Sequence, residues 1–337
     1  MLAPIPRCQS VLITSNTRPR RVDSSIMSAL GPLTTMNAGV LSAAGFLFLL
    51  AAAGSHASER TSRPSPPDAT TRPASPGPAQ TRITFIGSGT AVPGADDDTA
   101  CFIINGNFQV DCGWNSAINM RKYALDPLKI QTLYITHLHH DHYMGLPGLL
   151  FYRGMNRSNP LAKVPLKIVG PADDLPVVVD LSRRFLQADR FPEVWPAVEI
   201  KGIEPGQTYE TDEYRIQTVK ARHPVTALCS RLTDRTSGIV IAFSGDSAPD
   251  PDLATLAAGA DLLIHEASIG PKTPDDRMGK DHSRAIDAAR IARDAGVGRL
   301  ILIHLPAAQR EPSLSAAREI FPSTELAECG RSIVLKK

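Results

Sequence analysis

Five of the six residues 137–142 are of types that commonly bind metal ions, and His137, His139, Asp141 and His142 are the candidate ligands among them. The chain has 9 histidines among 337 residues, so a cluster this dense is improbable by chance. The cluster follows residues 133–135, which we predict to be a short buried strand, and therefore falls in a loop. A loop lets alternate residues converge on one point while their neighbours reach a second. Neutral imidazole and carboxylate are ligands that Zn²⁺ accepts, so the fold must place this loop at a metal site.

Polar residues also follow several other predicted strands. Strands come first in runs and then alternate with helices, which indicates a mixed α/β fold. Asp246, Glu266 and His304 stand just beyond the ends of predicted strands, and sheet edges are where such folds place ligand sites. We predict strands over residues 82–86, 101–104, 108–110, 133–135, 165–169, 214–220, 238–243, 261–264 and 299–303, and helices over residues 173–187 and 283–295.

The histidine loop, followed by Gly-Leu-Pro-Gly at residues 145–148, resembles the metal motif of the metallo-β-lactamase superfamily. The resemblance covers residues 82–305 and implies an α/β fold, an αββα four-layer sandwich of the metallo-β-lactamase type. Taken singly, a histidine before a proline would suggest a turn residue, and an aspartate would suggest a cap of a helix or turn. The resemblance therefore depends on the joint order of the motifs. The matching motifs are Asp111 in Asp-Cys-Gly, His223 in Arg-His-Pro-Val, Asp246 in Phe-Ser-Gly-Asp and His304 in Leu-Ile-His-Leu.

The resemblance implies a dinuclear site that holds two Zn²⁺ ions, or other divalent metals. Two such ions lie about 3.5–4 Å apart and share a hydroxide that attacks the substrate. Asp141 would also orient that hydroxide, which gives it a catalytic role, whereas Asp111 would support the loop and His140 would not be a ligand. The implied ligands are His137, His139 and His223 for one ion, Asp141, His142 and His304 for the other, and Asp246 as the bridge between them.

Two further segments, His265-Glu266-Ala267 and Asp281-His282-Ser283, resemble a pair found in the ribonuclease Z and arylsulfatase branches of the superfamily. In those branches the histidine, oriented by the glutamate, stabilises the transition state or protonates the leaving group. The resemblance therefore assigns His282 a catalytic role, with Glu266 as its partner, and we expect His265 to be structural. The alternative for His282 is a residue at the start of a helix beside an aspartate cap.

Several functions compete for a site of this kind. We favour a dinuclear-metal hydrolase that cleaves phosphodiester or sulfate esters, because the segment 244–266 is most similar to the phosphodiesterase and arylsulfatase branch. The alternatives are a transfer-RNA 3′-processing endonuclease similar to ribonuclease Z, and an acyl hydrolase of the lactonase or β-lactamase type. A mononuclear iron oxidoreductase on the same fold is a different class, which ligand types alone do not exclude. A non-catalytic member would be expected to have lost ligands, and all seven are present.

The endonuclease family typically inserts a long arm, which grips the transfer RNA, between the third-motif histidine and the bridging aspartate. Here His223 and Asp246 are only 23 positions apart, enough for two strands and a tight turn around residues 234–238. The usual Asp-Cys-Gly-Glu-Gly of that family is also Asp-Cys-Gly-Trp-Asn at residues 111–115. Both departures favour a small-molecule ester over nucleic acid as the substrate.

The composition changes near residue 80. The first 80 residues hold seven arginines and only three acidic residues, whereas the remainder is nearly neutral, which is also atypical of a protein that grips nucleic acid. We predict a signal peptide or membrane anchor over 1–57, a Pro/Ser-rich linker over 58–80 and a catalytic domain over 81–337. The chain is then expected to be exported, or, if the leader is a transit peptide, to enter an organelle. A homodimer is compatible with the sequence.

Five aromatic residues lie between positions 150 and 200, where we expect the walls of the substrate pocket. Aromatic side chains at helical or strand spacing most often belong to the core. We therefore predict that most of them are buried rather than free to contact a substrate. The five are Phe151, Tyr152, Phe185, Phe191 and Trp195.

Overall fold

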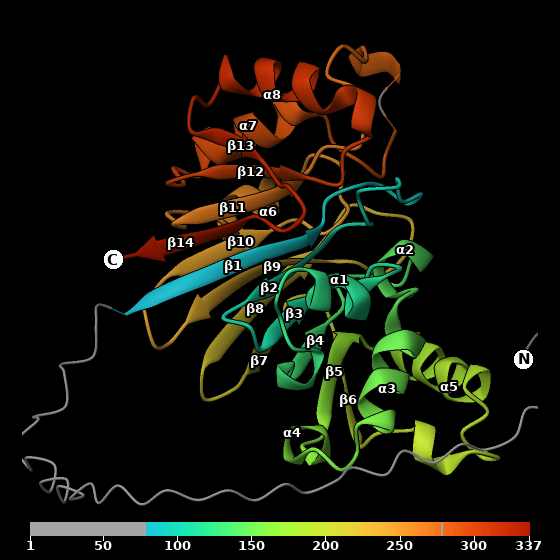
Figure 1. Cartoon of the computed structure of the whole chain (residues 1–337). Helices are drawn as coiled ribbons and strands as arrows, with labels where there is room; N and C mark the ends of the chain where they lie inside the picture. Colours follow the sequence, from blue (N-terminus) through green and yellow to red (C-terminus); the bar gives the residue numbers. More distant parts are fainter. Residues whose placement is uncertain (1–78, 278) are drawn as a thin grey trace, which may run out of the picture. The chain divides into compact units, whose positions relative to one another are not determined.

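The computed structural model describes residues 79–277 and 279–337, so the predicted leader and most of the predicted linker lie outside the described residues. Two seven-stranded sheets form the centre of the described part (Figure 1). Among the described residues, no helix combines the length and the apolar character needed to span a membrane. The first sheet consists, in spatial order, of β14 (Ser332–Lys336), β1 (Gln80–Gly87), β2 (Cys101–Ile104), β3 (Phe108–Val110), β4 (Thr132–Tyr134), β5 (Leu166–Pro171) and β6 (Val198–Ile203).

The second sheet begins with three parallel pairs and continues with antiparallel strands. Its parallel pairs join β13 to β12, β12 to β11 and β11 to β10. The first sheet likewise contains parallel pairs, between β3, β4, β5 and β6, so both sheets are mixed. The second sheet consists, in spatial order, of β13 (Thr324–Leu326), β12 (Leu300–Ile303), β11 (Leu262–Glu266), β10 (Val240–Phe243), β9 (Leu228–Asp234), β8 (Tyr214–Lys220) and β7 (Thr208–Glu210).

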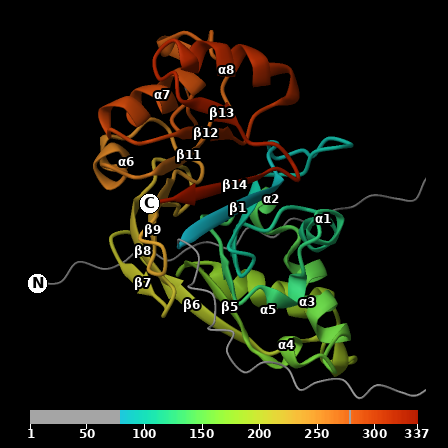
Figure 2. The ribbon, with the colours of Figure 1, turned by 60° about the vertical axis from the view of Figure 1, so that its left-hand side comes forward.

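Helices cover the outer face of each sheet (Figures 1 and 2). Those on the first sheet are α1 (Ser116–Lys122), α3 (Leu146–Met155) and α5 (Leu175–Phe185), and those on the second are α6 (Pro251–Leu256), α7 (Ala285–Asp294) and α8 (Arg310–Arg318). The shorter helices are α2 (His140–Tyr143), α4 (Pro160–Lys163), and the 3-10 turns η1 (Pro127–Lys129), η2 (Pro192–Val194), η3 (Asp275–Arg277) and η4 (Ala307–Gln309). The order helix, sheet, sheet, helix confirms the predicted αββα sandwich.

Three apolar layers hold these elements together. Phe102 of β2 and Phe243 of β10 meet edge to face between the sheets, with ring centroids 5.7 Å apart. Along β4 the side chains alternate, so that Tyr134 enters this central layer while Leu133 faces α1 and α3. Because both faces of the sheet are covered, the strand is apolar at consecutive positions. Full burial of one such side chain contributes about 1.5–3 kcal/mol to the free energy of unfolding.

Most predicted elements have counterparts with nearly the same bounds. The hairpin of β2 and β3 turns at Asn105 and Gly106, whose φ angles of 49° and 75° explain the Asn-Gly sequence. Two strands and a tight turn do fill the interval before Asp246, because β9 ends at Asp234 and β10 begins at Val240.

Two predictions differ from the structure. Helix α7 begins at Ala285, two residues after the predicted start, because Asp287 receives hydrogen bonds from the Arg284 backbone and side chain; His282 precedes the helix. Three of the five aromatic residues are also not core residues, since the side chains of Phe151, Phe185 and Phe191 are exposed. Phe151 lies on α3, Phe185 lies at the end of α5, and Phe191 directly precedes η2.

Candidate metal centre

The predicted ligands converge at one edge of the two sheets. Since β3 and β4 are parallel, and β10, β11 and β12 are parallel, the loops that leave their carboxyl ends meet there. The loop after β4 carries the histidine cluster and continues into α2, which Figure 1 shows at this edge. His223 lies in the connection between β8 and β9. An isolated antiparallel β-bridge between His137 and Ala227 holds this connection beside the histidine loop. Asp246 follows β10 and His304 follows β12.

The metal loop packs tightly against the loop that carries Asp111. Cys112 donates its backbone N–H to the carbonyl of His142 at 2.7 Å, and the Gly145 N–H returns a bond to the Cys112 carbonyl at 3.0 Å. A Cβ atom at Gly145 would lie 2.0 Å from the carbonyl oxygen of Gly113. Only glycine permits this approach, which accounts for the glycine at the start of Gly-Leu-Pro-Gly.

The seven side chains form two groups, and within each group the candidate ligand atoms lie within 4.8 Å of one another. Asp246 lies between the groups, because its Oδ2 atom is 3.5 Å from Nε2 of His142, 3.5 Å from Nε2 of His304 and 3.8 Å from Nε2 of His137. His140 is exposed and belongs to neither group. The first group is His137, His139 and His223, and the second is Asp141, His142, Asp246 and His304.

Outer partners fix the orientation of the imidazoles. Nδ1 of His142 lies 2.8 Å from Asp111 Oδ2, Nδ1 of His304 lies 2.7 Å from Ser268 Oγ, and Nδ1 of His223 lies 2.8 Å from the carbonyl oxygen of Asp281. Each ring therefore presents its Nε2 atom to the cluster, as metal-binding histidines typically do. Asp111 thus supports the loop as predicted, whereas Ser268 and the Asp281 carbonyl were not predicted. A backbone carbonyl leaves no signal in a sequence, and a serine leaves a weak one.

The residues present fit a pair of metal ions. Nε2 of His137 and Nε2 of His142 are buried without a hydrogen-bond partner among the described residues, which is unfavourable unless a ligand such as a metal ion satisfies them. Burial and neighbouring imidazoles lower the pKa of His137 well below its ordinary value, so this ring is neutral and able to bind metal. Burial alone would raise the pKa of Asp246, but the nearby imidazoles of His304 and His142 outweigh it and hold that pKa well below its usual range.

Backbone strain is concentrated at the same place. Asp111 and His304 have φ angles of 58° and 60°, in the left-handed region that non-glycine residues rarely adopt. Gly245, with φ of 58°, precedes the central aspartate and lies close to Thr136. Strain of this kind costs about 1–3 kcal/mol per residue and persists where the surrounding structure holds side chains in a functional arrangement.

His282 and Glu266 stand together beside the cluster. Nδ1 of His282 lies 3.1 Å from Glu266 Oε1, and the carboxylate also accepts bonds from the backbone N–H groups of Ser268 and Ser283. The side chain of His282 is 27% exposed and that of Glu266 is 1% exposed, so the histidine alone faces solvent. Burial opposes the charged ring, but the bond to Glu266 and the nearby charges of Glu266, Asp246 and Asp281 raise the pKa of His282 to about 9.

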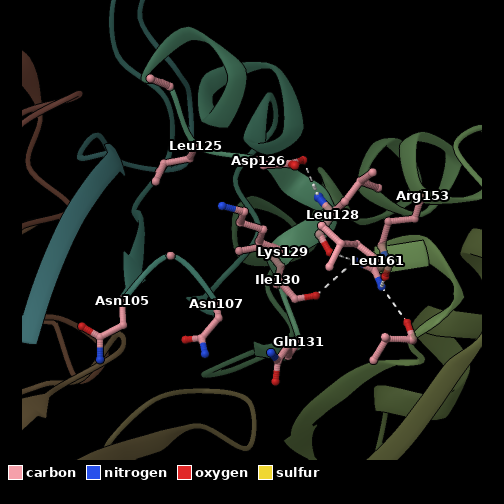
Figure 3. Close-up of a pocket in the computed structure, with 13 residues that line it drawn as sticks. Asn105, Asn107, Leu125, Asp126, Leu128, Lys129, Ile130, Gln131, Arg153 and Leu161 are labelled. Carbon is pink, nitrogen blue, oxygen red and sulfur yellow. Dashed lines mark hydrogen bonds between the residues drawn. The ribbon is translucent and has the colours of Figure 1, made fainter. Parts of the chain in front are cut away.

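A larger cavity lies elsewhere and is not the candidate site. Its volume is about 440 Å³, and it is lined by the β2–β3 turn, η1 and the segment around Leu161 (Figure 3). It stands at the amino end of β4, opposite to the metal cluster. The side chains of Asn105 and Asn107 are engaged in bonds to Asp234, Glu213 and Tyr214, and the Arg153 guanidinium binds the carbonyl groups of Leu128, Ile130 and Val164. These groups hold the fold together.

Removal of bound metal is expected to lower the melting temperature by roughly 5–10 °C. A ligand present at about 100 times its dissociation constant stabilises the folded state by about 2.7 kcal/mol, and 1 kcal/mol shifts the midpoint of a domain of this size by about 2–4 °C. Calorimetry of the full chain with zinc, after chelation, and after zinc is returned measures the effect. Mg²⁺ should restore little, because it prefers oxygen ligands. An unchanged midpoint after chelation would contradict metal binding at this cluster.

A family model described as "Beta-lactamase superfamily domain" matches residues 106–305. Among similar proteins, a ribonuclease Z of Methanothermobacter thermautotrophicus is 29% identical over 297 residues, which covers 73% of this chain and 94% of that protein. A ribonuclease BN of Cronobacter sakazakii is 26% identical over 304 residues, covering 73% of this chain and 97% of that protein. The residues that the family model matches, 106–305, contain the whole metal cluster.

Solved structures show the same fold. A metallo-beta-lactamase fold protein of Bacillus subtilis, YhfI, is 23% identical with a TM-score of 0.65, and the likeness covers 76% of this chain and 100% of that one. The short form of human tRNase Z is also 23% identical, with a TM-score of 0.60 and coverage of 75% and 98%. At this identity these likenesses concern the fold alone. Family model, fold and motif order agree, and the chain therefore belongs to the beta-lactamase superfamily, with the metallo-β-lactamase fold.

Proposed function

We propose that this protein is a zinc-dependent phosphodiesterase that cleaves RNA, as a ribonuclease Z-like endonuclease. The observation that carries the proposal is the placement of His282, whose Nδ1 atom lies 3.1 Å from Glu266 Oε1, beside the two ligand groups that meet at Asp246. The names of the similar ribonucleases support the phosphodiester as the substrate class. We therefore place phosphodiesters ahead of the sulfate esters that the sequence also allowed.

Each group of residues has a distinct task in this proposal. His137, His139 and His223 would hold one zinc ion, Asp141, His142 and His304 the other, and Asp246 would contact both. Bound there, the two ions would supply an activated water and stabilise the negative charge that develops on the phosphoryl group. Asp141, whose Oδ2 atom lies 3.0 Å from Nε2 of His304, has a second oxygen that would orient the attacking water.

His282 would deliver the proton that the leaving oxygen needs. Its Nδ1 atom is bonded to Glu266, which leaves Nε2 as the atom that faces the substrate. A carboxylate behind an imidazole both fixes the ring and stabilises its charged form. A positioned general acid of this kind typically contributes about 10²–10⁴-fold to the rate.

A second candidate function, the hydrolysis of a small phosphodiester, is favoured by the short connections around the site. The turn from Asp234 to Val240 replaces the arm by which the endonuclease family would grip transfer RNA. The alignment with the Methanothermobacter ribonuclease Z agrees with this. It spans 297 residues, although 73% of this chain amounts to only about 246 residues. The relative therefore has segments that this chain lacks.

The test is cleavage of a transfer-RNA precursor with a 3′ extension, beside bis(p-nitrophenyl) phosphate and p-nitrophenyl sulfate, by the zinc-loaded full chain. Our proposal expects cut precursor, slower turnover of the phosphodiester and none of the sulfate. Fast phosphodiester turnover without RNA cleavage would select the second candidate. Sulfate hydrolysis alone would contradict both. His140→Ala, which changes an exposed histidine outside both ligand groups, should behave as the natural protein and serves as the matched control.

A further inference from the structure

We propose that Arg284 is a positioning residue of the metal centre, because its side chain fixes the connection between β11 and α7, which supports two groups of the site. The structure describes this connection over residues 267–277 and 279–284. The expected effect on zinc binding is independent of the substrate, whereas the expected effect on catalysis rests on the proposed function.

Three consecutive residues at the end of the connection contact the site. The carbonyl oxygen of Asp281 lies 2.8 Å from Nδ1 of His223. Nδ1 of the next residue, His282, lies 3.1 Å from Glu266 Oε1, and Ser283 donates its backbone N–H to the same oxygen at 2.9 Å. A displacement of this short stretch would therefore turn the ring of a candidate zinc ligand and move the proposed proton donor together.

Arg284 follows these residues directly and is 7% exposed. Its Nη1 atom donates to the carbonyl of Thr273 at 2.8 Å and also lies 2.8 Å from Oδ1 of Asp275. Its Nε and Nη2 atoms donate to the two carboxylate oxygens of Asp287, at 2.8 and 3.0 Å. Such a two-point contact holds a guanidinium in one orientation. The side chain therefore joins α7 to Thr273, which lies 11 positions earlier in the chain.

The middle of the connection has few other attachments. Among the described residues, Arg284 makes every side-chain hydrogen bond and ion pair that joins residues 271–277 to the rest of the domain. The two ends of the connection are held separately, since Ile269 donates its N–H to the carbonyl of Ser283 at 3.1 Å, and Ser283 Oγ donates to the carbonyl of Ser247 at 2.7 Å. Without the guanidinium, the ends would stay closed while the middle is released, and residues 281–282 lie between the two.

The chemistry of arginine separates this role from that of a helix cap. Arg284 is the N-cap residue of α7, a position where Ser, Thr, Asp and Asn are preferred because their oxygens accept a bond from the first turn. A guanidinium has donors only and cannot accept such a bond. The backbone N–H of Arg284 is bonded instead by Asp287, at 3.2 Å. The buried charge at this position is therefore explained by its reach to the connection.

The experiment compares the natural full chain with Arg284→Ser and begins with backbone hydrogen exchange of the metal-free protein. Serine at the N-cap with an acidic residue three positions later is a favourable helix start, so the variant keeps α7 while it loses the guanidinium. Exchange in the connection should become about tenfold faster, the effect expected when a hydrogen bond from a charged group is removed. Exchange in α7 should stay unchanged.

Zinc binding in competition with a chelator, and turnover, are measured on the same proteins. Arg284→Ser should weaken the binding of one of the two zinc ions about tenfold, since groups that orient metal-binding imidazoles typically account for about 10–100-fold in affinity. At saturating zinc, kcat should fall about tenfold for precursor RNA and by less for bis(p-nitrophenyl) phosphate, because only the RNA needs the proton from His282. Arg284→Lys keeps the charge without the two-point contact and should give intermediate values.

Arg290→Gln is the matched control. Arg290 also pairs with Asp287, at 3.2 Å, but its side chain is 50% exposed and is bonded to no described residue of the connection, so all three measurements should match the natural chain. Unchanged exchange in the connection of Arg284→Ser, or unchanged zinc affinity, would overturn the proposal. Faster exchange throughout α7 with a lower Tm would overturn it as well, because Arg284 would then stabilise only the helix. Weaker zinc binding by Arg284→Ser, in a protein whose natural form cleaves neither RNA nor ester, would support the role of Arg284 and contradict the proposed function.

Discussion

Replacement of Asp246 by alanine is expected to lower kcat for phosphodiester hydrolysis by more than about 10³-fold and to reduce the bound zinc from about two ions per chain to one or fewer. Asp246 is the carboxylate that faces both ligand groups, with three imidazole Nε2 atoms within 3.8 Å of its Oδ2 atom. Its loss removes the one carboxylate that lies near imidazoles of both ligand groups. Kinetics at saturating zinc together with metal analysis of the purified chain measure both effects.

The same measurements on Asp252→Asn provide the control. Asp252 lies six residues further along the chain, is exposed in the first turn of α6 and contacts no predicted ligand, so the change should leave kcat and zinc content unaltered. Asp246→Asn keeps the side-chain volume and removes the charge. Its kcat and zinc content should be close to those of Asp246→Ala, because the proposed role of Asp246 depends on its charge. Full activity in Asp246→Ala would show that the assigned cluster is not the catalytic site.

Replacement of His282 by alanine is expected to lower kcat for RNA cleavage by about 10²–10⁴-fold. The leaving oxygen of a ribose is a poor leaving group without a proton. His282, whose pKa is raised by its bond to Glu266, is the group beside the cluster that can donate one. A p-nitrophenolate ion leaves without a proton, so hydrolysis of bis(p-nitrophenyl) phosphate should fall by less than about tenfold. Zinc content should not change, because His282 belongs to neither ligand group.

The difference between the two substrates is what identifies proton donation. Equal losses for both substrates would mean that His282 stabilises charge in the transition state rather than protonating the leaving group. Glu266→Gln should show a smaller loss with the same substrate dependence, since glutamine can still accept the bond from the ring but no longer stabilises its charge. His140→Ala, the nearby exposed histidine, should cleave both substrates normally.

The local sequence determined a large part of this molecule. Period-two apolar patterns placed β2, β3 and β8 at their observed bounds, and the Asn-Gly pair placed the hairpin turn, because both signals depend on residues adjacent in the chain. The same holds for the candidate ligands. Side chains able to bind zinc are rare, and their order along the chain matched a known family, so all seven could be named without coordinates.

Local signals failed where a distant residue decides the outcome. The start of α7 depends on how Arg284 bonds Asp287 and the carbonyl of Thr273 in the preceding loop, so the helix begins at Ala285 instead of residue 283. The exposure of Phe185 could not be predicted either, because a stripe at helical spacing looks the same whether it faces a core or solvent.

The sequence by itself therefore determined the fold class, the superfamily and the identity of the candidate ligands. Only the tertiary structure decided how they meet. His304 and Asp141 are 163 positions apart, yet their side chains lie 3.0 Å from one another, because the parallel strands of both sheets end at one edge. The support of His304 by Ser268, of His223 by the Asp281 carbonyl and of His282 by Glu266 arises in the same way. Such contacts depend on the pairing and packing of whole strands, and no short stretch of sequence encodes them.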